Sequence, residues 1–145
     1  MSKVVLIING PNLNLTGIRE PDIYGICSFK DYFLILEKKY PDINFIFFQS
    51  NSEGEIIDML HKHGFTISGI IINAGAYSHT SLAIADAISA INSPVIEVHI
   101  SNVFKRESVR HKSFIASVSA GMISGFGLDS YRLAVEALLE IISKK

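Results

Sequence analysis

Four apolar runs in this chain each end in a cluster of Gly, Asn, Ser and His residues. The runs and the clusters that follow them are VVLII before NGPNLN, FIFF before QSNS, GIIIN before AGAYSH, and VIEVHI before SN. Continuous apolar strands of this kind are buried on both faces, as in a parallel sheet. Ligands of open parallel sheets bind beyond the carboxyl ends of the strands. The sequence therefore predicts a functional site at one edge of a parallel sheet.

Helix-like segments alternate with these strands along the whole chain. The predicted helices cover about 29–39, 53–63, 79–91 and 129–142, and Ser28, Ser52 and Ser78 are the expected N-caps of the first three. A fifth strand is expected over 117–124. Strands that alternate with helices form βαβ units. The prediction is one α/β domain over residues 1–145, with a flavodoxin-like five-stranded parallel sheet of order 2-1-3-4-5 and helices on both faces.

Composition narrows the classes of partner. The net charge is −1, which favours neither nucleic acid nor an acidic membrane surface. No apolar stretch approaches the ~20 residues of a membrane span, and no signal peptide is expected. The single cysteine, Cys27, excludes an internal disulfide and fits a reducing cytoplasm. No Cys/His cluster has the spacing of a structural zinc site.

Two predicted helices are too apolar for a monomer of this size. The YFLIL segment at 32–36 and the segment at 82–91 carry apolar residues on more than one face. A helix that is apolar all round is buried all round. A thick core is one explanation, but subunit contacts in a homo-oligomer are favoured in a chain of 145 residues.

The long loop after the first strand and the turn after the third carry candidate binding groups. Residues 9–25 form a loop of the length typical of a functional lid, and it contains Arg19 and Tyr24. In isolation it could equally be a surface loop with a solvated Arg and a packed Tyr. The turn from Asn73 to His79 offers small residues and amides suited to an anion or a polyol. A structural role for His79 at a helix cap remains open.

Three further positions have both a chemical and a structural interpretation. Glu97 and His99 alternate on one strand, so their side chains share a face and suit acid–base work, although a buried structural pair is the alternative. Asp86 lies seven residues after His79, which predicts that both lie on the same face of one helix, two turns apart. A lone Asp in an apolar segment needs a polar ligand or an intersubunit partner. Arg110 lies in a short basic patch and could meet a substrate carboxylate.

Two other classes of protein with this fold lack support, because the sequence motifs that they need are absent. A flavodoxin-like flavin- or nucleotide-binding module fits the fold, but no phosphate loop follows the first strand. A receiver-like signalling domain needs acidic residues after strands one and three, where this chain has Asn9 and Asn73.

The motifs taken together resemble one enzyme family. The segments IINGPNLNLTGIREPDIYG, QSNSEGEIID, IIINAGAYSHTS and IEVHISN, with the later RE and RH pairs, are similar to those of the type II 3-dehydroquinate dehydratases. The resemblance covers essentially the whole chain. It implies loss of water from 3-dehydroquinate to give 3-dehydroshikimate through an enolate, in the shikimate pathway of aromatic amino-acid and chorismate biosynthesis. It also implies a dodecamer built from trimers, without metal or cofactor.

The resemblance also implies a role for each site residue. Tyr24 would be the general base, Arg19 would keep it anionic, and His99 would be the general acid, oriented by Glu97. Asn12 would hold a water at the enolate oxygen. The substrate-binding set would comprise Asn73, His79, Asp86 (in a neighbouring subunit's pocket), the amides of Ile100 and Ser101, and Arg110. Ala74 and Phe104 depart from the family pattern at positions that carry no chemistry.

The chemistry of an enolate is consistent with these roles. Tyrosine has an unperturbed pKa near 10, so lowering it by about three units requires roughly 4 kcal/mol of differential stabilisation of the phenolate. An arginine in a dry pocket can supply much of that. Charge develops on one enolate oxygen, which water, backbone amides and Arg can stabilise without a metal.

Overall fold

The computed structural model describes residues 2–18, 22 and 27–145. Five parallel strands form one sheet in the order β2-β1-β3-β4-β5, which confirms the predicted topology. The strands are β1 (Lys3–Asn9), β2 (Ile43–Gln49), β3 (Gly69–Asn73), β4 (Val95–His99) and β5 (Gly121–Ser124). The α-helices are α2 (Phe29–Lys39), α3 (Glu53–His63), α4 (Leu82–Ala90) and α5 (Asp129–Ser143). Short 3-10 turns are η1 (Leu13–Leu15), η2 (Gly75–His79), η3 (Val103–Lys105), η4 (Ser108–Arg110) and η5 (Ala116–Val118).

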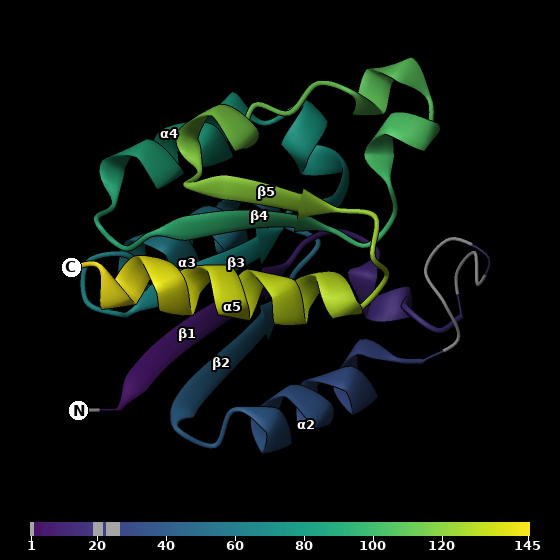
Figure 1. The fold of residues 1–145 in the computed structure, drawn as a ribbon. Coiled ribbons are helices and arrows are strands. Elements are labelled where there is room, and N and C mark those ends of the chain that lie inside the picture. Colours follow the sequence, from purple (N-terminus) through teal and green to yellow (C-terminus); the bar gives the residue numbers. More distant parts are fainter. Residues whose placement is uncertain (1, 19–21, 23–26) are drawn as a thin grey trace.

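The helices cover both faces of the sheet (Figure 1). The α2 and α5 helices pack on one face, and their apolar side chains share a core with Val5, Ile7 and Ile71. The α3 and α4 helices pack on the other face against Ile70 and Ile72. Alternation along each strand sends successive residues to opposite cores. No helix of the described residues is long and apolar enough to cross a membrane.

Serine caps determine where the helices begin. The Ser28 hydroxyl accepts from the amide of Asp31, and the Ser52 hydroxyl accepts from the amide of Glu55, so α2 and α3 begin as predicted. The Gly64 amide donates to Leu60 O at the end of α3. A Cβ on Gly64 would lie 2.5 Å from the Ile91 side chain, so close packing is what this glycine permits.

The predicted helix over 79–91 was wrong at its start. The chain first makes the η2 turn, and the hydroxyl of Ser81, rather than Ser78, caps α4 by accepting from Ile84 N at 3.0 Å. The helix begins after Ser81 because the amides of Thr80 and Ser81 both donate to the Tyr77 carbonyl. These bonds keep the preceding residues in a tight turn. His79 therefore does not share a helix with Asp86, and the predicted common face does not exist.

The predicted strand over 117–124 was too long. Residues Ala116–Val118 form a 3-10 turn, and β5 begins only at Gly121. The hydroxyls of Ser117 and Ser119 donate to the carbonyls of Phe114 and Ile115. Such local side-chain bonds give the backbone an alternative to a sheet ladder.

Candidate active site

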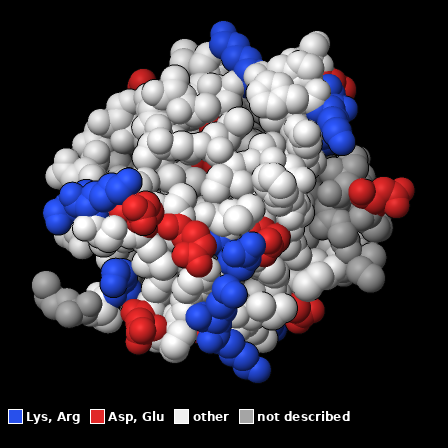
Figure 2. Space-filling view, in the orientation of Figure 1, with Lys and Arg blue, Asp and Glu red and all other residues white. Residues whose placement is uncertain are grey.

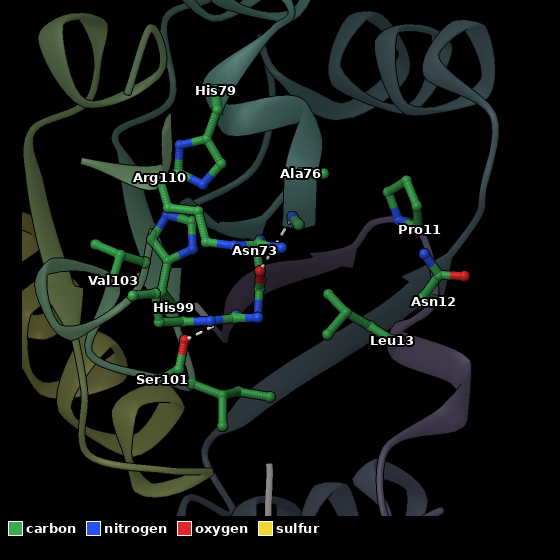
Figure 3. Close-up of a pocket in the computed structure, with 13 residues that line it drawn as sticks. Pro11, Asn12, Leu13, Asn73, Ala76, His79, His99, Ser101, Val103 and Arg110 are labelled. Atoms are coloured by element: carbon green, nitrogen blue, oxygen red, sulfur yellow. Dashed lines mark hydrogen bonds between the residues drawn. The ribbon is translucent and has the colours of Figure 1, made fainter. Parts of the chain in front are cut away.

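The polar residues at the carboxyl edge of the sheet surround one cavity of about 190 Å³ (Figure 3). Its lining comprises Pro11, Asn12, Leu13, Asn73, Gly75, Ala76, His79, His99, Ile100, Ser101, Val103, Arg106 and Arg110. Figure 3 shows His79, His99 and Arg110 on one side of the cavity and Pro11, Asn12 and Leu13 on the other. The structure thus brings together seven of the predicted site residues, from four separate segments of the chain.

His99 and Glu97 form a buried pair at the end of β4. Glu97 is fully buried, and its Oε2 accepts a hydrogen bond from Nε2 of His99. This bond leaves Nδ1 as the ring nitrogen available to a substrate. A carboxylate behind an imidazole orients the ring and stabilises its protonated form. The pair has the arrangement that general acid catalysis requires.

Ser113 completes this pair and was missed by the sequence analysis. Its hydroxyl lies 2.8 Å from both carboxylate oxygens of Glu97 and also accepts from the amide of Ala116. Since the amide occupies the hydroxyl as an acceptor, the hydroxyl proton is directed at Glu97. Ser113 lies in a segment with several serines, and no spacing in the sequence shows which of them turns inward.

His79 lies beside the acid pair and is held by a backbone carbonyl. Its Nδ1 is 2.7 Å from Lys112 O, and because a carbonyl only accepts, Nδ1 carries the proton and Nε2 is left as an acceptor. Burial lowers the pKa of His79, and the nearby His99 and Arg110 act in the same direction. A neutral imidazole in this position can accept a hydrogen bond from a hydroxyl group.

The basic side of the cavity is built on turns η3 and η4. Arg110 lines the cavity, and its Nε lies 3.2 Å from Oε2 of Glu107. Arg106 also lines it and donates from Nη1 to the Ser101 hydroxyl at 3.3 Å, although the sequence analysis did not assign Arg106 a role. Two arginines on the lining make the cavity suited to a carboxylate.

Asn12 adopts a backbone conformation that is uncommon for a residue with a side chain. Its φ of 68° lies in the left-handed region, and its amide donates to Oδ1 of Asn51 at 3.0 Å. Gln49 also donates to Asn51 Oδ1, so β2 supports the loop that carries Asn12. Strained positions of this kind concentrate at binding sites.

The β1 and β3 loops meet behind the cavity at a glycine. The Gly10 amide donates to Asn73 O at 2.7 Å, and a Cβ on Gly10 would lie 2.5 Å from Ala74 O. Only a residue without a side chain fits here. The contact fixes the separation of Asn12 from Asn73 across the cavity.

Two of the predicted catalytic residues, Arg19 and Tyr24, lie outside the described residues. Asp86 is exposed on α4 and is not among the residues that line the cavity of this single chain. Neither Ala74 nor Phe104 is among the described lining residues. The described residues contain no group of three or more His, Cys, Asp or Glu placed to hold a metal ion.

A doubly wound α/β fold with two histidines and two arginines around one polar cavity, and a buried carboxylate behind one of the histidines, is typical of an enzyme of small anionic substrates. Residues 3–139 match the model of the class II dehydroquinase family. A 3-dehydroquinate dehydratase of Exiguobacterium sp. is 57% identical over 137 residues, covering 94% of each chain. A 3-dehydroquinate dehydratase of Caldicellulosiruptor saccharolyticus is 56% identical over 143 residues, covering 97% of this chain and 99% of the other.

A solved structure agrees with the sequence relatives. The crystal structure of a type II dehydroquinase from Butyrivibrio crossotus superimposes with a TM-score of 0.92 at 43% identity, covering 95% of this chain and 98% of the other. The chain belongs to the class II dehydroquinase family. These relationships give no support to the alternative of a flavin- or nucleotide-binding module.

Proposed function

We propose that this protein is a 3-dehydroquinate dehydratase of type II, a hydro-lyase that converts 3-dehydroquinate to 3-dehydroshikimate in the shikimate pathway. Membership of the class II dehydroquinase family indicates this reaction. The structural observation that supports it is the buried Glu97–His99 pair at the cavity, which is suited to acid catalysis. We place the protein in the cytoplasm, as one catalytic domain that assembles into a homo-oligomer, by the family pattern a dodecamer built from four trimers.

The substrate carries a ketone, a carboxylate and several hydroxyl groups, and the cavity offers a partner for each kind. Arg110 and the amides of Ile100 and Ser101 would bind the carboxylate, because cations and backbone N–H groups favour negative charge. His79 Nε2 would accept from a hydroxyl, and the Asn73 carboxamide can both donate and accept. Asp86 would serve the pocket of a neighbouring subunit.

The reaction begins with removal of the acidic proton next to the ketone. Tyr24 would take this proton as a phenolate stabilised by Arg19. Burial raises the pKa of Tyr32 to about 12 and also that of Tyr131, which is the opposite of what a base needs. The negative charge then moves to the ketone oxygen, where a water held by Asn12 would stabilise the enolate.

The second step expels the hydroxyl group. His99 would donate the proton on Nδ1 to the leaving oxygen while the enolate collapses, so that water leaves and the carbon–carbon double bond forms. The Glu97 carboxylate accepts the hydrogen bond from Nε2 and so keeps the His99 ring oriented during this transfer. The proposed base and acid come from different segments of the chain, which lets each work on a different part of the substrate.

The experiment that tests this function is a direct assay. The purified protein is mixed with 3-dehydroquinate, and the ultraviolet absorbance of the conjugated enone in 3-dehydroshikimate is followed. We expect an increase in absorbance with the native protein and none with His99→Ala over the same time. No increase with the native protein, at any concentration of substrate, would refute the proposal.

A further inference from the structure

Three polar side chains meet in the apolar core directly behind the cavity. Asn9 ends β1, Asn73 ends β3 and Tyr131 lies in α5, and they are exposed by only 1%, 2% and 0% respectively. The two asparagines are register partners on adjacent strands, so their side chains point to the same face of the sheet, where α5 packs. Asn73 alone of the three also lines the cavity.

The hydrogen bonds of this cluster run in one direction. The Gly75 amide donates to Asn73 Oδ1 at 3.2 Å, which identifies that atom as the oxygen because an N–H needs an acceptor. Asn73 Nδ2 then donates to the Tyr131 hydroxyl at 3.0 Å, and the hydroxyl donates in turn to Asn9 Oδ1 at 2.6 Å. The donor and acceptor roles in each bond determine those in the next. The carboxamide of Asn73 therefore has a single favourable orientation.

Tyr131 is itself held rigidly. Its ring packs edge-on against Phe29, with centroids 4.8 Å apart, and the side chain is fully buried. Burial raises the pKa of its hydroxyl, so the group keeps its proton and remains a donor to Asn9 throughout the working pH range. A buried aromatic ring with a fixed hydroxyl is a suitable reference point for a neighbouring flexible amide.

We propose that Tyr131 is a positioning residue for substrate binding and acts through Asn73. Its hydroxyl uses one N–H of the Asn73 carboxamide, while Gly75 uses one lone pair, and this leaves the second N–H and the second lone pair for a hydroxyl of the substrate. The inference rests on the proposed function for the identity of that substrate. It goes beyond that function because Tyr131 lies on α5 and is not among the residues that line the cavity.

The test is a double-mutant cycle with Tyr131→Phe and Asn73→Ala. Tyr131→Phe keeps the ring and removes the hydroxyl, so KM for 3-dehydroquinate should rise about five- to tenfold while kcat changes less than about twofold. In the Asn73→Ala background the same substitution should change KM less than about twofold, since there is no carboxamide left to orient. Tyr40→Phe is the matched control. It removes a tyrosine hydroxyl that is bonded to Glu136 of α5, the helix that also carries Tyr131, and it should leave KM unchanged.

Additive effects of the two substitutions would overturn the inference, since Tyr131 would then act only through general stability. If Tyr131→Phe does not fold, Asn9→Ala tests the same chain of bonds from its other end and should show the same dependence on Asn73. A crystal structure of Tyr131→Phe provides a readout that needs no turnover. It should show the Asn73 carboxamide rotated, and an unmoved carboxamide would refute the positioning role even if the native protein proved inactive on 3-dehydroquinate.

Discussion

The imidazole rings of His79 and His99 lie nearly parallel in the cavity, with centroids 5.8 Å apart and planes 20° apart. They are held by different partners. His79 donates from Nδ1 to the Lys112 carbonyl, whereas His99 donates from Nε2 to the Glu97 carboxylate. The Lys112 carbonyl leaves His79 Nε2 free to accept a hydrogen bond, whereas the Glu97 carboxylate suits His99 to donate a proton from Nδ1.

The lowered pKa of His79 predicts a pH dependence of stability. Burial is its main cause, and it makes the folded chain disfavour protonation relative to the unfolded chain, where the pKa is about 6.5. The contribution of His79 to the free energy of unfolding is therefore fully present above about pH 6.5 and is lost as the pH falls below it. Denaturant unfolding of the native protein and His79→Gln should differ more at about pH 7.5 than at about pH 5.5. A difference that grows on acidification would contradict the assignment.

His99→Ala should reduce kcat far more than it affects KM. The loss of a general acid removes an interaction made in the transition state and costs about a hundredfold or more. Steady-state kinetics with 3-dehydroquinate measure both constants, and His61→Ala, at an exposed position on α3, is the control. A rise in KM at unchanged kcat would show that His99 only binds the ground state.

Ser113→Ala should lower kcat by about three- to tenfold, because Glu97 loses a hydrogen bond and with it part of its fixed orientation. Ser117→Ala is a matched control in the same segment, since its hydroxyl donates only to the Phe114 carbonyl. Circular dichroism and thermal unfolding should show that both variants fold. Equal kcat values for the two variants would show that Ser113 does not contribute to orienting Glu97 and His99.

Tyr24→Phe should abolish turnover and leave the fold and the assembly intact, because the substitution removes only the proposed base. Circular dichroism, light scattering and the enone assay measure the three properties separately. Losing a general base should cost at least about a hundredfold. Activity within a few-fold of the native protein would reject Tyr24 as the base.

Light scattering at micromolar concentration should give a mass well above the 16.0 kDa of one chain and larger than a dimer. Leu34 and Ile35 on α2 and Leu82 on α4 are 52%, 55% and 60% exposed in the single chain. Figure 2 also shows a broad, almost uncharged face over β5, whereas acidic and basic groups are mixed over α5 and α2. Ile35→Asp should reduce the mass and Glu37→Gln should not. A monomer for the native protein would refute this prediction.

The sequence predicted the sheet, its order and the edge that holds the site, because apolar runs and their polar ends are local signals. Alternation also placed Glu97 and His99 on one face, and the structure confirms it. The start of α4 was wrong because Ser78 and Ser81 are equally good caps in sequence. Only the tight turn η2 decides between them.

The missed residues depend on contacts between distant parts of the chain. No role was assigned to Tyr131 from the sequence, yet its hydroxyl meets Asn73, 58 positions away, and Asn9, 122 positions away. Ser113 and Arg106 lie in the irregular segment between β4 and β5, where no periodicity indicates which side chains face the cavity. Such contacts arise from the packing of whole elements.

The close approach of Gly10 to Ala74 restricts which substitutions this family of sites can accept. Gly10 performs no chemistry, but even the methyl group of alanine would collide with the neighbouring carbonyl and push the first and third strand ends apart. Asn12 and Asn73 would then move relative to one another, and a substrate that bridges the two residues would lose its contact with one of them. Substitution at this position is therefore limited by space as strictly as substitution of a catalytic residue is limited by reactivity.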